Sequence, residues 1–221
     1  MKKSKVLCIP GWDEGCRVFD KIKDYLKDYI DFIYVELPGF NNNVLPNKAY
    51  TPFDYASYVN NLNLEFDYIL AHSYGGKVAL EYYFNFQKVK LIFLGPSIIT
   101  PHKSLFTKLK IIKYKVLKRL NLLNKYKEYG SVDYQNAKGV MKETFRIAIK
   151  TYYDSELEKI EDDTLLIYGK NDKKTPISEG KRITKRIRNS KLEIIDGDHF
   201  MMLNNASMVS KLIYRFTRED K

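Results

Sequence analysis

Long apolar segments, cysteines and histidines are scarce in this 221-residue sequence. No stretch approaches the ~20 apolar residues of a membrane-spanning helix, and the apolar run at residues 6–9 is too short for a signal-peptide core of ~7–15 residues. Cys8 and Cys16 are the only cysteines, which excludes a disulfide framework, and three histidines exclude a histidine-rich metal site. We therefore expect a cytoplasmic protein that binds no metal.

Acidic residues are missing from residues 103–127, a segment that holds nine of the 38 lysines and arginines. The remaining chain has 29 basic and 27 acidic residues, so the net charge of +11 comes mostly from this segment. No zinc-ligand spacing, RNP motif or helix-turn-helix pattern accompanies it, and we expect no nucleic-acid partner. Its apolar residues fall at helical spacing. The predicted basic helix is either a solvated lid or a weak contact with an anionic membrane.

Short continuous apolar runs recur along the chain and predict strands that are buried on both faces. Helical patterns separate the runs, and this alternation is typical of an α/β fold with a mostly parallel sheet. The length and the 44% apolar content suffice for one domain with a substantial core. The predicted strands are residues 6–9, 32–37, 68–71, 89–94, 164–168 and 192–195.

The interval between the fourth and fifth predicted strands is too long for a simple connection and must contain structure of its own. It includes the basic helix and a second helix expected over residues 136–153. We therefore predict a helical cap inserted after the fourth strand. The chain divides into a first part of the core at 1–96, the cap at 97–160 and a second part of the core at 161–221.

The segment YILAHSYGGKVALEYY, residues 68–83, runs from an apolar strand through a tight turn into an apolar helix. This is the context of a nucleophile elbow, in which the turn projects Ser73 from the carboxyl end of a strand. The residues two before and two after the serine must be small, because strand and helix pass closely, and Ala71 and Gly75 meet that need. We expect the side chain of His72 to point away and to be structural.

A serine hydroxyl needs a base to become a nucleophile, and the base needs an acid to orient it. His199 follows the last predicted strand, and Asp172 follows the strand before it, so both reach the same sheet edge as Ser73. This order of serine, acid and histidine fits the elbow. The other histidine after the serine, His102, opens the predicted cap. Thr175 is expected to cap the helix that follows Asp172.

The order of these motifs resembles that of the α/β-hydrolase superfamily over nearly the whole chain. The similar segments are LCIPGW at 7–12, VELPGF at 35–40, the elbow, LLIYGKNDKKTP at 165–176 and GDHFMML at 197–203. The segment GSVDYQNAKGVMKETF at 130–145 is similar to the cap of small bacterial members. The resemblance implies an α/β-hydrolase fold, here with about six strands, because the chain starts directly at the strand before the oxyanion loop.

Two departures from the family pattern bear on the site residues. In the oxyanion loop, Pro10-Gly11 replaces the usual His-Gly, so the glycine is kept and a supporting side chain is lost. Asp198 stands where glycine is usual, which makes Asp198 and Asp196 rivals of Asp172 as the catalytic acid. We favour Asp172, because an acid next to the histidine in sequence cannot easily reach its Nδ1 atom.

The resemblance implies a serine hydrolase that cleaves a small or medium carboxylic ester with Ser73, His199 and Asp172. The oxyanion hole would be the backbone N–H groups of Trp12 and Tyr74. No metal or cofactor is implied, and the expected partner is a small-molecule ester. Alternatives stay open: a thioesterase, an amidase or peptidase, a lyase with the same triad, or a non-catalytic ligand-binding protein on the same scaffold.

Overall fold

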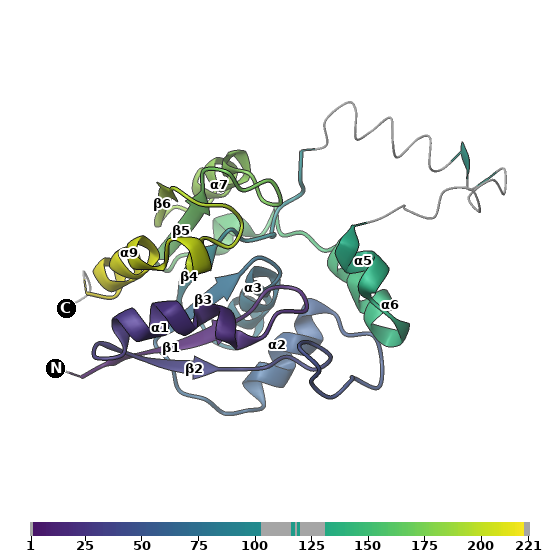
Figure 1. Cartoon of the computed structure of the whole chain (residues 1–221), viewed down its shortest axis with the longest axis horizontal. Coiled ribbons are helices and arrows are strands. Elements are labelled where there is room, and N and C mark those ends of the chain that lie inside the picture. The colour runs from purple at the N-terminus through teal and green to yellow at the C-terminus, as the bar shows by residue number, and fades with distance from the viewer. Residues whose placement is uncertain (1, 103–115, 118, 120–130, 219–221) are drawn as a thin grey trace.

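Six parallel strands form one sheet in the order β2-β1-β3-β4-β5-β6 (Figure 1). The number of strands and their parallel arrangement are as the sequence predicts. The structure, a computed structural model, describes residues 2–102, 116–117, 119 and 131–218. The central strands β3 and β5 are buried along their whole length, which explains their continuous apolar runs. The strands are β1 (Ser4–Ile9), β2 (Ile30–Tyr34), β3 (Tyr68–His72), β4 (Lys90–Leu94), β5 (Thr164–Gly169) and β6 (Ser190–Ile195).

Strand β2 begins and ends earlier than the predicted residues 32–37. Its ladder to β1 ends at the pair of Cys8 with Tyr34. Val35 and Leu37 continue the apolar run and are buried, but they pack in the core beyond the ladder. The predicted end of the strand was wrong because apolar residues are also needed where the chain is buried beyond the last paired residue of the strand.

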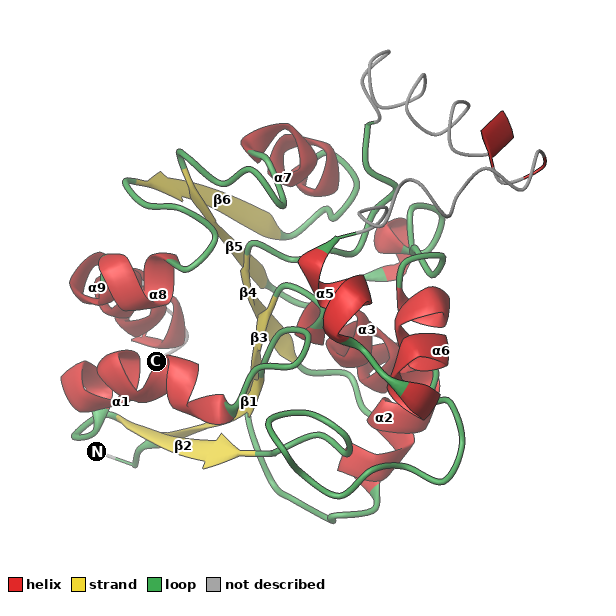
Figure 2. Cartoon of the chain, turned by 45° about the vertical axis from the view of Figure 1, so that its right-hand side comes forward, coloured by secondary structure: helices red, strands yellow, loops and turns green. Residues whose placement is uncertain are grey.

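Helices cover both faces of the sheet (Figure 2). One core cluster joins the sheet to α2, α3 and α7, and the other joins it to α1, α8 and α9. No helix in the described part of the chain has the length and apolar character that a membrane crossing requires. The helical elements are η1 (Cys16–Phe19), α1 (Asp20–Leu26), α2 (Pro52–Asn60), α3 (Gly75–Asn85), α5 (Val132–Asn136), α6 (Gly139–Ala148), η3 (Leu157–Lys159), α7 (Ile177–Thr184), α8 (Met201–Asn204) and α9 (Ala206–Arg218).

The strand order reverses between β1 and β3. The chain leaves β1 toward β2 on one side and later adds β4, β5 and β6 on the other side. Such a reversal opens a crevice at the carboxyl ends of the two strands, where open α/β sheets bind ligands. Ile9 pairs with Ala71, so the loop after β1 and the turn after β3 start side by side.

Helices α5 and α6 lie in the connection between β4 and β5, where the sequence predicts a cap. The expected single helix over residues 136–153 was wrong in its bounds. The chain leaves helical geometry at Ala137, turns with a positive φ at Gly139 and ends α6 at Ala148. Most of the predicted basic helix at 103–127 lies outside the described residues, and the boundaries of the cap at 97–160 stay a prediction.

Candidate active site

Ser73 occupies the sharp turn between β3 and α3 with a φ of 48°, a left-handed conformation that a serine adopts only under constraint. This turn can lie close to the end of β1 because Gly75, two residues after Ser73, has no side chain. A methyl group on Gly75 would lie 2.5 Å from the carbonyl oxygen of Ile9 and 2.6 Å from that of Pro10. The backbone of the elbow is therefore pressed against the start of the predicted oxyanion loop.

His199 lies between Ser73 and Asp172 and contacts both. Its Nε2 is 3.0 Å from the Ser73 Oγ, and its Nδ1 is 2.8 Å from the Asp172 Oδ2. The His199 side chain is 6% exposed and the Asp172 side chain is fully buried. With the Nδ1 proton donated to the carboxylate, Nε2 is free to accept the proton of the serine hydroxyl. The three residues that the sequence predicts from three separate loops thus form one hydrogen-bonded line.

The carboxylate of Asp172 is held by four donors. Its Oδ1 accepts from the backbone N–H groups of Lys174 and Thr175 at 2.8 and 2.9 Å, and its Oδ2 faces the Thr175 hydroxyl at 2.8 Å as well as His199. Burial alone would raise the pKa of Asp172, but the bonds to His199 and Thr175 hold that pKa below its usual value. Asp172 is therefore kept ionised beside the imidazole.

Thr175 does not cap α7 as the sequence predicts. Pro176 stands at the N-cap position, and no side chain caps that end. The Thr175 hydroxyl instead lies 2.8 Å from the Asp172 carboxylate and 3.0 Å from the Gly95 carbonyl oxygen. Gly95 leaves room for this group, because a methyl group there would lie 3.0 Å from the Asp172 Oδ2. Neither contact has a local sequence signal.

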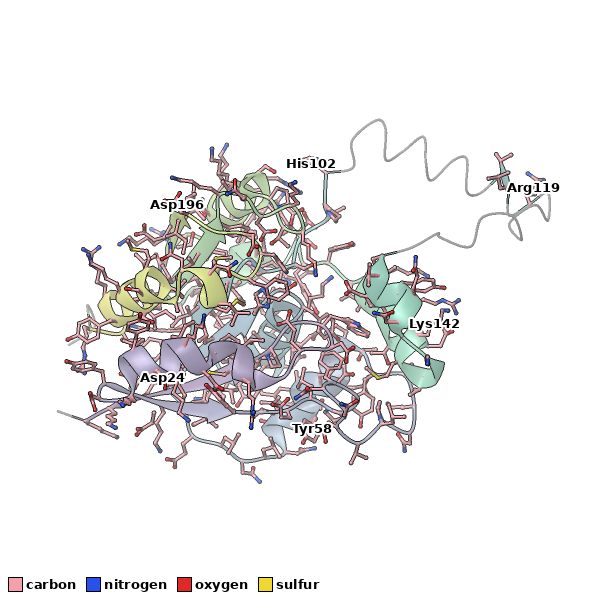
Figure 3. All side chains as sticks on the ribbon, viewed as in Figure 1. Asp24, Tyr58, His102, Arg119, Lys142 and Asp196 are labelled. Atoms are coloured by element: carbon pink, nitrogen blue, oxygen red, sulfur yellow. The ribbon has the colours of Figure 1, made fainter. Side chains whose placement is uncertain are left out.

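The rival acids have other partners. Asp196 is 84% exposed and pairs with Lys170 at 2.8 Å, at the outer surface of the molecule (Figure 3). The Asp198 Oδ1 accepts from the backbone N–H of Phe200 at 2.8 Å, and so begins the turn into α8. Among the described residues, Asp172 is the carboxylate that contacts His199. His102 is exposed.

Trp12 and Tyr74 follow the ends of β1 and β3, which are paired neighbours. Outside the helices and strands, no backbone carbonyl of the described residues accepts from either backbone N–H. The Trp12 ring packs edge-on against Phe40, Tyr74 and Phe145 at centroid distances of 5.0, 5.4 and 4.8 Å. Phe145 belongs to α6, so the Trp12 ring lies between the residues of the elbow and α6.

Glu14 has contacts at the site that the sequence does not predict, and His72, which is expected to be structural, has a specific partner in it. The Glu14 Oε2 accepts from the Gly11 N–H at 2.9 Å and lies 2.7 Å from the His72 Nδ1. The His72 Nε2 lies 3.0 Å from the carbonyl oxygen of His199. Burial would raise the pKa of Glu14, but His72 and the Gly11 N–H together lower it. The fully buried His72 thus ties the loop after β1 to the histidine loop.

A cavity of about 300 Å³ opens beside Ser73 and is enclosed by the elbow, the loop after β1 and the helix α6. Its wall mixes aromatic and aliphatic groups with a few charged side chains, as small-molecule sites usually do. It is lined by Trp12, Glu14, Ser73, Tyr74, Lys77, Ser97, Ser131, Asp133, Phe145, Ala148, Ile149, Tyr152, Lys174 and Thr175.

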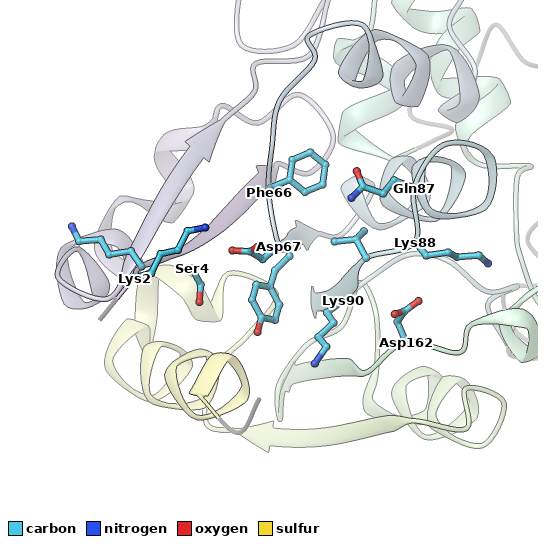
Figure 4. A pocket seen from close by; sticks show the side chains of 11 residues that line it. Lys2, Ser4, Phe66, Asp67, Gln87, Lys88, Lys90 and Asp162 are labelled. Carbon is cyan, nitrogen blue, oxygen red and sulfur yellow. The ribbon is translucent and has the colours of Figure 1, made fainter. Parts of the chain in front are cut away.

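A larger hollow of about 510 Å³ lies at the opposite edge of the sheet (Figure 4). Its walls include Ser4, Tyr68 and Lys90, which begin β1, β3 and β4. That edge is the amino-terminal one, away from the strand ends that carry Ser73, Asp172 and His199. The smaller cavity is the one that Ser73 lines. Within the described residues, no three His, Cys, Asp or Glu side chains gather as a metal ion would require.

Comparisons with known proteins agree with this geometry. A model of the alpha/beta hydrolase family matches residues 6–210. The esterase EaEST from Exiguobacterium antarcticum has 22% identity and a TM-score of 0.75, over 97% of this chain and 92% of that chain. A thermophilic esterase from Thermogutta terrifontis has 17% identity and a TM-score of 0.73, over 99% and 90%.

The similar structures do not share one reaction in their names. The meta-cleavage product hydrolase of Pseudomonas fluorescens has 14% identity and a TM-score of 0.72, over 100% of this chain and 92% of that chain. At these identities the likeness is one of fold. No curated protein sequence matches this one. The match of the family model over most of the sequence, together with the parallel six-stranded sheet, places this chain in the alpha/beta hydrolase family.

Proposed function

We propose that this protein is a serine hydrolase that cleaves a small or medium carboxylic ester through an acyl-enzyme. The observation that carries the proposal is the hydrogen-bonded line from Ser73 through His199 to Asp172 at 3.0 and 2.8 Å. It ends in a cavity of about 300 Å³, which matches a substrate of modest size. Membership of the family supports hydrolysis in general, and the ester is our inference from the site.

In the proposed reaction, the Ser73 Oγ attacks the acyl carbon while its proton passes to the His199 Nε2. The negative charge that develops on the former carbonyl oxygen is held by the N–H groups of Trp12 and Tyr74. His199 then gives its proton to the leaving alcohol, and the C–O bond breaks. A water molecule, deprotonated by His199, releases the carboxylic acid and restores Ser73. Asp172 holds the imidazole in the required tautomer throughout.

A chain-length series of 4-nitrophenyl esters, from acetate to octanoate, tests both the reaction and the size of the cavity. Ser73→Ala and His199→Ala should each lower kcat/KM by at least ~10³ without unfolding the protein. Asp172→Asn should also be severe, because the histidine loses its orientation. A fluorophosphonate should label the wild type covalently and leave Ser73→Ala unlabelled.

Asp198→Asn is the matched control for the acid, because Asp198 adjoins His199 in sequence but bonds Phe200. It should keep most of the activity. Loss of activity in Asp198→Asn with retention in Asp172→Asn would contradict the assignment of the acid. Thioesters and anilides of the same acyl groups separate a thioesterase or an amidase from an esterase. Wild-type protein that neither cleaves these compounds nor reacts with the fluorophosphonate would contradict a catalytic function.

A further inference from the structure

Lys77 is a buried cation that lines the cavity beside Ser73, and the proposed reaction does not use it. It is the third residue of α3, four residues after Ser73 in sequence, and Ser73 itself lies in the turn before that helix. The residue is 2% exposed. Lysine is seldom buried to this degree unless a partner compensates its charge.

The partners of Lys77 in the structure are neutral. Its Nζ donates to the carbonyl oxygens of Ala148, at 2.8 Å, and of Thr151, at the end of the cap helix α6. The Tyr152 ring lies 4.2 Å from the Nζ. No carboxylate of the described residues lies within 4 Å of it. Two carbonyl oxygens and one aromatic ring therefore surround the cation, and no anion balances its charge at close range.

The other charged groups at the cavity do not supply that compensation. Glu14 is paired with His72 at 2.7 Å. Asp133 and Lys174 line the same cavity with opposite charges. Glu179, buried in α7, acts on Lys77 only at longer range. Burial lowers the pKa of Lys77 to about 7, which is the expected response of a cation that lacks a close anion.

We propose that Lys77 is a specificity residue that binds a carboxylate on the acyl group of the ester, so that this enzyme prefers monoesters of dicarboxylic acids. The inference rests on the proposed esterase function. The acyl group is favoured over the alcohol because the alcohol must leave and let water in, whereas the acyl group stays attached to Ser73. Lys77 is the least exposed of the residues that line the cavity, which suits a contact with the acyl group that stays bound.

The test compares charged and neutral esters of equal length: the 4-nitrophenyl monoesters of adipic and suberic acid against 4-nitrophenyl hexanoate and octanoate. The measured quantity is the ratio of kcat/KM for the charged ester to that for the neutral ester. We expect Lys77→Met to lower this ratio about tenfold or more at pH 6.5 for at least one length, the effect of one charge-assisted hydrogen bond. Lys150→Met, an exposed lysine beyond α6, is the control of equal charge and should leave the ratio unchanged.

The ratio also responds to pH in the wild type. As the pH rises from 6 to 8.5, Lys77 loses its proton near its pKa of about 7, so the preference for the charged ester should fall. The effect of His199 on the reaction cancels in the ratio. This measurement needs no variant, so it stands even if Lys77→Met fails to fold.

The outcomes separate the two proposals. If the wild type cleaves the neutral esters and Ser73→Ala does not, the esterase function is supported, but the specificity proposal is not yet tested by that result. If, in addition, the ratio is unchanged in Lys77→Met at both lengths, or is independent of pH in the wild type, Lys77 only anchors the cap helix and the specificity proposal is wrong. If Lys77 has only an anchoring role, Lys77→Met should lower kcat/KM for the charged and the neutral ester equally and leave their ratio unchanged. Absence of all cleavage would contradict the esterase function itself.

Discussion

Two buried carboxyl groups near the site differ in charge state because their surroundings differ. Asp172 is surrounded by donors, and its pKa lies below the usual value despite burial. Glu179 receives no side-chain or backbone hydrogen bond from the described residues, and burial raises its pKa to about 7 in spite of Arg182. Burial raises the pKa of both carboxyl groups, and the hydrogen bonds that only Asp172 receives make its net shift downward.

Replacing Glu179 by glutamine should stabilise the protein at high pH and leave it unchanged at low pH. The folded-state pKa of about 7 lies above the ordinary value of 4.5. The contribution of Glu179 to stability is therefore fully present below pH 4.5 and is lost as the pH rises through 7, because folding then requires the uptake of a proton. Glu179→Gln stays neutral, so its advantage should grow to on the order of 1–3 kcal/mol at pH 8.

Urea unfolding at pH 5 and pH 8 measures this difference in the free energy of unfolding. The control is Glu65→Gln, whose side chain is 89% exposed and pairs with Lys5 at the surface. It should change stability little at either pH. If Glu179→Gln destabilises the protein equally at both pH values, the carboxyl group makes a favourable contact that the structure does not reveal, and the direction of its pKa shift is wrong.

At the scale of elements, the site depends on how closely α3 approaches the end of β1. Gly75 and Gly76 are adjacent at the start of α3 but differ in what faces them. A methyl group on Gly75 would meet two backbone carbonyl oxygens at 2.5 and 2.6 Å, whereas on Gly76 it would meet the side chains of Ile98 and Pro96 at 3.0 Å. Backbone cannot move away as a side chain can.

Gly75→Ala should therefore lower the free energy of unfolding by about 1–3 kcal/mol and slow fluorophosphonate labelling of the folded protein, because the elbow shifts from the oxyanion loop. Gly76→Ala should be milder in both respects, since alanine also favours the helix. Thermal unfolding measures the change in stability. The rate of fluorophosphonate labelling, taken at a temperature where both variants are fully folded, measures the change in reactivity. Equal labelling rates in Gly75→Ala and the wild type would show that the close approach has no part in the reactive geometry.

The sequence predicts elements well where a single local pattern decides them. The strands before Ser73 and Asp172 are continuous buried apolar runs, as predicted, and each site residue follows the carboxyl end of its strand. The strand before His199 is also present, but it contains Glu193 and only its Ile195 is buried, so the prediction of burial on both faces was wrong for this edge strand. The helix expected over residues 136–153 was wrong because periodicity does not register the break at Ala137. The contacts of Glu14 were missed because its partner His72 is 58 residues away. No local pattern reports a contact that only the assembled sheet creates.

At the scale of the whole molecule, the charge is uneven. Nine lysines and arginines without an acid fall in residues 103–127, while the rest of the sequence is nearly balanced. We propose that this segment gives the protein a weak contact with anionic membranes. Each basic residue near an anionic surface contributes about 1 kcal/mol, and the attraction falls off within about 10 Å at 0.1 M salt.

Co-sedimentation with vesicles tests the contact. The protein should bind vesicles that contain phosphatidylserine, bind neutral ones poorly, and detach at 0.5 M salt. Lys110→Glu with Lys113→Glu should weaken binding at least about tenfold, because two charges are reversed. Lys181→Glu with Lys185→Glu, at exposed positions of α7 and its end, changes the net charge equally and should have less effect. Equal loss in both pairs would indicate a response to net charge alone, and no binding would contradict the contact.

The line from Ser73 to Asp172 has a consequence for how the protein folds. Ser73 and His199 lie 126 residues apart in the chain, and β4, β5 and β6 lie between them in sequence. Closing such a long loop is slow and comes late in assembly. Under the proposed mechanism, we therefore expect Ser73 to become reactive only when the sheet is complete. During refolding, the time at which a fluorophosphonate begins to label Ser73 should therefore report the final step of assembly. Before that step, His199 does not yet lie beside the serine.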